Sequence, residues 1–322
     1  MEKIMPQRNG AVYIHDPDVA MQTIQPIVAE VLDGAGLDAF VRVYEDTRSL
    51  YAGRYPGYRA SNTRYHDFAH ALSVVLAAAR LLHGCREAGL PILPRQGLTA
   101  LIAAFFHDAG FIQTEEDHKG SGAKYMVGHE ERSIRFLRRY LAGNNFSTEE
   151  IENGADFIRC TVLGLSPTEI GFSSAEAQTC GCIVGSADLL AQLADRLYLE
   201  KLLLLFMEFE EARLPEFQTA LELLQKTADF YDSVARKRLD EQLGAVYRHM
   251  RTHFQRWLGV DEDGYARAIS QNIAYLKTMI DRCGDIFDCY LQHLRRGGIA
   301  DRVRDELGGT ENAGLGGFMH RQ

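Results

Sequence analysis

The chain has 322 residues, of which 46% are hydrophobic and 25% charged, and 44 acidic against 35 basic residues give a formal net charge of -9. This composition is ordinary for a globular protein with a substantial core, and it excludes wholesale disorder. The acidic charge argues against nucleic acid as a partner, so an anionic small molecule would have to be attracted locally, most simply by bound cations.

The cysteines and the apolar runs indicate where the protein resides. None of the six cysteines forms a Cys-x-x-Cys pair, and we expect all six to be reduced, mostly buried thiols. The N-terminal residues lack the apolar stretch of a secretory signal, and the most apolar run, Leu202–Met207, is far shorter than a membrane span. These features predict a cytoplasmic protein without membrane contact.

Apolar residues recur at helical spacing along most of the chain, and no stretch alternates as a half-buried strand would. The pattern predicts an all-α fold with helices, in chain order, over residues 16–33, 36–50, 65–88, 95–109, 128–142, 148–163, 176–195, 197–212, 215–258, 262–282 and 284–296. The stretch 215–258 must contain a break, which Gly244 could supply. Ser147, with Glu150 three residues later, has the form of a capping box at a helix start.

The chain shows no internal repeat and no Pro/Ser-rich linker, so we predict a single domain over residues 1–299. Five glycines among the last fifteen residues predict a flexible tail over 300–322. The apolar run that ends at Met207 is either part of the core or a dimer face, which leaves a homodimer as the alternative.

The first candidate ligands are His66 and His70, which lie four residues apart at the start of the predicted helix 65–88. At this spacing two side chains share one helix face, one turn apart. They could be metal ligands or a partly buried polar pair, and the spacing alone does not decide between these interpretations.

His107 and Asp108 end the strongly apolar helix predicted over 95–109. A histidine is favourable near a helix C-terminus, and Gly110 could stop the helix, but neither explains a carboxylate at this position. Burying Asp108 unpaired would be costly, and a metal ion would remove that cost.

Asp188 is another carboxylate among apolar residues of a predicted helix, and alone it could simply be capped by its own helix. One set combines imidazoles and carboxylates suited to Zn, Mn, Fe or Mg, with too few ligands to close the coordination sphere: His70, His107, Asp108 and Asp188. Open coordination positions are what a catalytic metal needs.

The order of these motifs resembles that of the HD-domain metal-dependent phosphohydrolases. More narrowly, Tyr65-His66-x-x-x-His70-Ala71 is similar to the Tyr-His-x-x-x-His-Ala motif of class I cyclic nucleotide phosphodiesterases. The similarity covers about residues 60–260 and continues through Leu98–Asp108, Glu130 after His129, Ala187-Asp188-Leu189 and Phe230-Tyr231-Asp232. Five motifs in this order are far more specific than a lone His-Asp pair.

The resemblance implies an HD/phosphodiesterase-like helical bundle, of the bacterial type, that hydrolyses a nucleotide phosphate ester with two divalent metal ions. By the same resemblance, the set of His70, His107, Asp108 and Asp188 would hold the first ion. Asp108 would bridge to the second ion, and Glu130 would bind water beside it. His66 would be the general acid, and either His118 or His129 could ligate the second ion or be a solvated loop residue.

The chain departs from the phosphodiesterase family at two positions. The family has a further His four residues after the first His of its His-Asp motif, where this chain has Phe111. The family grips the base with a Gln three residues before the Phe equivalent to Phe230, where this chain has Thr227, with Gln225 two residues away. Gln225, Thr227 and Phe230 are weak candidates for substrate contact. The family's way of recognising the base cannot be carried over to this chain.

The substrate predicted first is a cyclic nucleotide, and a nucleoside mono- or polyphosphate is the alternative. The competing class of protein is a non-catalytic module in which the metal site senses a ligand. Loss of the family's extra His, at Phe111, is the feature that would favour this class.

Overall fold

The computed structural model describes residues 10–13 and 16–304, and this part of the chain is all-α, as predicted. It contains no β-strand, and two isolated bridges join Ala52 to Ala60 and Tyr58 to Thr114. The helices are α1 (Pro17–Val31), α2 (Leu37–Tyr51), α3 (Phe68–Glu87), α4 (Pro94–Phe106), α5 (His129–Ala142), α6 (Thr148–Arg159), α7 (Ala175–Leu193), α8 (Tyr198–Glu211), α9 (Ala220–Phe230), α10 (His249–His253), α11 (Gly264–Cys283) and α12 (Phe287–His293). Short 3-10 or π turns are η1 (Ala109–Phe111), η2 (Gly122–Tyr125), η3 (Pro167–Glu169), η4 (Tyr231–Ala235), η5 (Arg238–Gln242), η6 (Val246–Arg248) and η7 (Phe254–Leu258).

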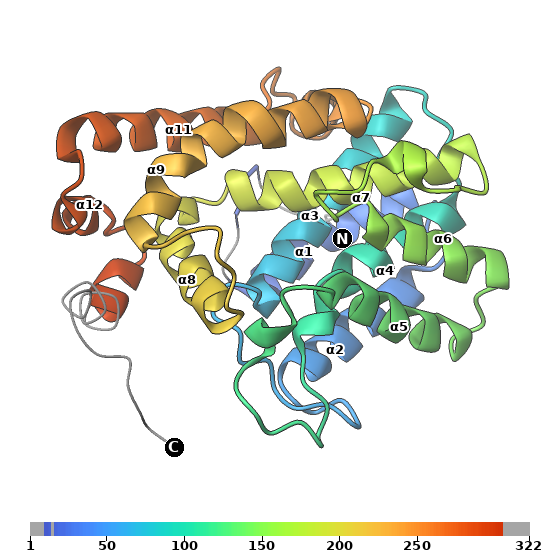
Figure 1. Cartoon of the computed structure of the whole chain (residues 1–322). Coiled ribbons are helices and arrows are strands. Elements are labelled where there is room, and N and C mark those ends of the chain that lie inside the picture. Colours follow the sequence, from blue (N-terminus) through green and yellow to red (C-terminus); the bar gives the residue numbers. More distant parts are fainter. Residues whose placement is uncertain (1–9, 14–15, 305–322) are drawn as a thin grey trace, which may run out of the picture.

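The helix α3 forms the centre of the bundle. Every residue from His70 to Cys85 is buried, and α3 contacts α1, α4, α7 and α10. Figure 1 shows α3 and α7 in the middle, with α5 and α6 to one side and α8 and α9 to the other. By length and composition α3 could cross a membrane, but 89% of its most apolar window is buried inside the fold. Packing on all sides explains why this helix is apolar all round.

The predicted helix 215–258 is interrupted where Gly244 was expected to break it. It begins later, at Ala220, and passes through the π turns η4 and η5 before the chain reverses. Gly244 and Ala245 have φ of 63° and 53°, and a left-handed pair cannot continue a right-handed helix. The capping box at the start of α6 is also present, because Ser147 and Glu150 bond each other's backbone amides.

Two expectations about the C-terminal part are wrong. Cys283 and Cys289 form a disulfide, because the turn between α11 and α12 brings their Cα atoms to 5.5 Å, whereas the other four cysteines are free and buried. Residues 299–304 are helical, and Ile299, Ala300 and Val303 are buried in the core, so these residues are no flexible tail. The rest of the predicted tail, 305–322, lies outside the described residues.

The apolar run that ends at Met207 belongs to the core rather than to a dimer face. It lies in α8, where Leu202, Leu203 and Phe206 are at most 3% exposed. Leu202 and Leu205 also line the largest cavity described below. The run therefore gives no support for a homodimer.

A buried guanidinium fixes the loop that follows α6. Arg238, on η5, is 2% exposed and donates hydrogen bonds to the carbonyl oxygens of Cys160, Val162, Leu163 and Leu165. These carbonyls follow the end of α6, where backbone acceptors lack helical partners. One side chain thus holds the loop that forms part of the cavity wall.

Replacing Arg238 by Met should lower the free energy of unfolding by roughly 3 kcal/mol, because one buried and three partly buried hydrogen bonds from a charged donor to carbonyl oxygens are lost. Arg236→Met is the matched control, since that side chain is 59% exposed and makes one ion pair at 3.9 Å. The control should change stability by about 0.5 kcal/mol or less. Equilibrium denaturant unfolding measures both, and equal losses would contradict the role given to Arg238.

Candidate metal centre

The candidate ligands meet in a cavity of about 600 Å³. One part of its wall is polar and comes from the turn before α3, α3 itself, the end of α4, the start of α5, and α7. It contains His66, His70, His107, Asp108, His129, Glu130 and Asp188. Another part is apolar and comes largely from α8, α9 and neighbouring loops: Leu163, Leu202, Leu205, Phe209, Leu214, Phe217, Leu223 and Phe230. A wall of this kind suits a small molecule that carries both a polar and an apolar group.

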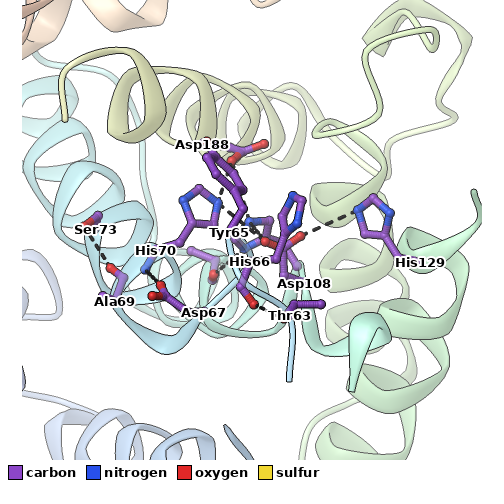
Figure 2. Close-up of polar contacts among 12 residues, drawn as sticks. Thr63, Tyr65, His66, Asp67, Ala69, His70, Ser73, Asp108, His129 and Asp188 are labelled. Carbon is purple, nitrogen blue, oxygen red and sulfur yellow. Dashed lines mark hydrogen bonds and ion pairs between the residues drawn. The ribbon is translucent and has the colours of Figure 1, made fainter. Parts of the chain in front are cut away.

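The four predicted ligands of the first ion are brought together from α3, α4 and α7. His70 Nε2 lies 3.4 Å from both Asp108 Oδ2 and Asp188 Oδ1. His107 Nε2 lies 3.1 Å from Asp108 Oδ2 and 3.6 Å from Asp188 Oδ1. The ligand atoms of His70, His107 and Asp108 all lie within 4.8 Å of one another and could hold one ion, and Asp188 Oδ1 lies beside the two histidine nitrogens. Figure 2 shows His70, Asp108 and Asp188 turned toward one another.

Two buried atoms of this set have no hydrogen-bond partner within the described structure, His107 Nε2 and Asp108 Oδ2. His107 Nδ1 lies 2.9 Å from the carbonyl oxygen of Ala104. A carbonyl only accepts, so Nδ1 carries the proton in the neutral ring and Nε2 presents its lone pair to the site. With a neutral ring, two acceptors would face each other, which is costly unless a proton or a cation lies between them, and the ligand set fits a divalent transition metal.

In the metal-free protein the charges of this cluster offset one another. Burial opposes a charge on the His107 ring, but the Asp108 and Asp188 carboxylates outweigh burial and raise the pKa of His107 to about 9. Burial also opposes the Asp108 carboxylate, but His107 and His66 hold the pKa of Asp108 well below its usual range. A cation that enters the site therefore takes the place of a histidine proton.

His129, rather than His118, lies beside the expected second ion. His129 Nε2 is 3.6 Å from Asp108 Oδ1, the oxygen that does not face His70 and His107 (Figure 2). Its Nδ1 lies 2.8 Å from the carbonyl oxygen of Met126, so Nε2 is the nitrogen free to bind a metal. His118 is exposed in the loop between η1 and η2 and does not line the cavity.

Glu130 follows His129 in the first turn of α5 and also lines the cavity. Its Oε2 lies 3.5 Å from His129 Nδ1. The carboxylate therefore lies on the Nδ1 side of the His129 ring, whereas Nε2 is the nitrogen that faces Asp108.

His66 does not share a helix face with His70, contrary to the spacing argument. Asp67 is the N-cap of α3, because its side chain accepts a hydrogen bond from His70 N, so His66 lies in the turn before the helix. The two rings still approach to 6.1 Å between centroids. His66 still lines the cavity, but the turn before α3 places it there, and not the first turn of the helix as expected.

Glu208 orients His66, and the sequence analysis missed this residue. His66 Nδ1 lies 2.5 Å from Glu208 Oε2, and the other carboxylate oxygen accepts from Tyr65 N at 2.6 Å. Burial opposes the charged ring, but Glu208 outweighs burial and raises the pKa of His66 above its usual value. Glu208 is 2% exposed at the end of the apolar run of α8, and a carboxylate in such a run was the signal that could have revealed it.

Phe111 stacks against two imidazole rings of the site, whose centroids lie 6.2 Å apart. Its ring centroid lies 4.2 Å from that of His66 and 4.2 Å from that of His129, with interplanar angles of 16° and 22°. Phe111 offers no ligand atom to the site, but it contacts both imidazoles through their faces.

The turn η1 packs directly on α5 through Gly110. A Cβ at this position would lie 1.9 Å from the carbonyl oxygen of His129, so no other residue fits. Gly110 N donates to Ser133 Oγ at 2.8 Å, and Arg132 donates to the carbonyl oxygens of Gly110 and Ile112. This contact sets the distance between Asp108, just before η1, and His129.

The three weak candidates for substrate contact differ in position. Thr227 and Phe230 line the cavity, but Thr227 Oγ1 donates to the carbonyl oxygen of Leu223 in its own helix. Gln225 does not line the cavity, because its amide donates to the carbonyl of Gly284 and to Asp285. The amide side chain that does line the cavity is Gln192, on α7.

Comparisons with known proteins add one family model, described as Npun_R2479-like, which matches residues 117–256. The matched region includes His129, Glu130 and Asp188 but not His66, His70 or the His107-Asp108 pair. No curated protein and no solved structure matches the chain.

We expect the purified protein to carry a transition metal, and Asp108→Ala to remove more of it than any other single substitution, because Asp108 faces both groups of ligands. His129→Ala should remove the more weakly held part of the metal, and the exposed His118→Ala is its matched control. Elemental analysis after preparation without chelator, followed by metal titration, measures both. Absence of Zn, Mn, Fe, Ni and Co together with no uptake would contradict the site, and equal losses in the two histidine variants would contradict the place of His129.

Gly110→Ala should lower metal content although residue 110 bears no ligand, because the added Cβ must push η1 away from α5. Gly143→Ala at the other end of α5 is the control, since its Cβ would meet no atom closer than 3.5 Å. Metal content per folded chain and thermal unfolding should both fall in the first variant only. Full metal content in Gly110→Ala would show that this approach does not set the ligand geometry.

Proposed function

We propose that this protein is a metal-dependent phosphohydrolase of the HD/phosphodiesterase type that cleaves a phosphate ester of a nucleotide, with a cyclic nucleotide phosphodiester as the first candidate. The observation that carries the proposal is the pair of buried atoms without a hydrogen-bond partner among the described residues, His107 Nε2 and Asp108 Oδ2, in the cavity that is also lined by His66, which Glu208 holds from behind. Ligand atoms and an oriented acid in one cavity are the parts that phosphoester hydrolysis requires.

The chain's own residues would divide the work as follows. One ion would be held by His70, His107, Asp108 and Asp188, and a second by Asp108 and His129 with Glu130 beside them. Divalent cations held there would acidify a water molecule and offset the negative charge of phosphoryl oxygens. An acidic protein would thereby bind an anionic substrate.

His66 would act as the general acid. Glu208 holds Nδ1 and favours the protonated ring, so that Nε2–H can donate its proton to the leaving oxygen. Phe111 fixes the plane of the ring by stacking. A positioned acid of this kind contributes about 10²- to 10⁴-fold in rate.

The apolar part of the cavity would take the base. Phe230 and neighbouring leucines offer packing, whereas Thr227 and Gln225 make other hydrogen bonds. Packing alone discriminates weakly between purines, so Gln192 is the side chain from which a hydrogen bond to the base would come.

Phosphate release from a nucleotide panel with Mn²⁺ tests the proposal. A coupled phosphatase reveals hydrolysis of 3′,5′-cyclic nucleotides, and nucleoside mono-, di- and triphosphates are assayed directly. Turnover of the cyclic nucleotides alone supports the first candidate, whereas turnover of the others supports the alternative. Tight binding of a nucleotide without turnover in the metal-loaded protein would overturn the proposal in favour of a sensing module.

His66→Ala should keep the metals while kcat falls by about 10²- to 10⁴-fold, whereas His70→Ala should lose metal as well as activity. The loss in His66→Ala should shrink for a nitrophenyl phosphodiester, because a phenolate leaves without a proton. Metal analysis and kcat on both substrates give the answer, with His118→Ala as the control. Loss of metal in His66→Ala, or equal losses on both substrates, would exclude the acid role.

A further inference from the structure

A second cavity, of about 450 Å³, lies against η1 and the side of α5. Ala109 and Gly110 form part of its wall, whereas the preceding Asp108 lines the metal cavity. Four arginines of α5 line this second cavity, together with Tyr58 and Phe136: Arg132, Arg135, Arg138 and Arg139. We name it the arginine cavity.

The positive charge of the arginine cavity is largely uncompensated. No Asp or Glu is among its lining residues, and Arg138 alone of the four pairs with a carboxylate, that of Glu152 at 2.5 Å. Arg132 is bonded to backbone carbonyls, and Arg139 donates to the hydroxyl of Tyr58. Arg135 is exposed and has no hydrogen bond or ion pair within the described part of the chain.

This clustering is costly for the helix by itself. Arg135 and Arg139 are four residues apart and therefore lie on one helix face, where like charges destabilise a helix. The chain as a whole is acidic, with a net charge of -9, so general attraction of anions does not explain the cluster. A bound anion would remove the repulsion.

We propose that the arginine cavity binds the phosphate group of a small molecule. Guanidinium groups match phosphate oxygens with paired hydrogen bonds, and Arg135 and Arg139 have donors left for them. The cavity is large enough for more than a phosphate ion, so the group could belong to a nucleotide or be free phosphate. The site uses no metal ligand and does not depend on the proposed hydrolysis.

Isothermal titration of the full chain tests the proposal, first as purified and again after treatment with chelator, which removes phosphate binding through metals. The titrants are inorganic phosphate, pyrophosphate and AMP, with AMP added only to the chelated protein. The test variant is Arg135→Gln/Arg139→Gln, in which both side chains are exposed. Arg282→Gln is the matched control, an exposed helical arginine on α11 with no hydrogen bond or ion pair to the described residues.

The wild type and Arg282→Gln should bind equally, and the double variant should bind at least about tenfold more weakly in both preparations, because each lost guanidinium removes charged hydrogen bonds. Tighter binding of AMP than of phosphate, lost in the double variant, identifies a nucleotide as the source, whereas equal binding identifies free phosphate. No binding at millimolar concentration, or unchanged binding by the double variant, overturns the proposal. Either result is independent of whether the metal centre hydrolyses anything.

Discussion

The buried carboxylate of Asp108 is the constraint around which the site is built. The apolar helix α4 delivers it to a position where it is 3% exposed, and Oδ2 faces His70 and His107 while Oδ1 faces His129. A buried charge must be matched by opposite charge, here by protonated histidine or by a cation. The surrounding helices are therefore placed so that imidazoles approach this carboxylate from two sides.

The turn η1 transmits this constraint to the rest of α5. Gly110 allows the turn to touch the helix, and Arg132 and Ser133 bond its backbone, so the position of Asp108 is tied to that of His129 at the helix start. The same turn forms a wall of the arginine cavity. Two sites of different chemistry thus share one short element, and a change in the packing of η1 would reach both.

Local patterns predicted the helices and singled out the residues proposed for the first ion, because His70, His107, Asp108 and Asp188 each stand out against apolar helical neighbours. Features that depend on long-range contacts were beyond this reasoning. Glu208 lies 142 residues from His66 in sequence, and the Cys283–Cys289 pair depends on a chain reversal. The start of α3 was predicted at residue 65, but the helix begins at Phe68. Asp67 is its N-cap, and the hydrogen bond from His70 N to the Asp67 side chain reveals this role.

The two expected ion positions are unequal in the ligands that the described residues offer them. Three mutually close ligand residues, His70, His107 and Asp108, face the first position with Asp188 beside the two histidines, whereas the second is faced by Asp108 Oδ1 and His129. Phe111 supplies no ligand or hydrogen bond there, but it holds the His129 ring in place through its face. A position with fewer protein ligands binds a metal ion more weakly. The second ion should therefore be lost first, and its binding should depend most on His129, which Phe111 contacts by stacking.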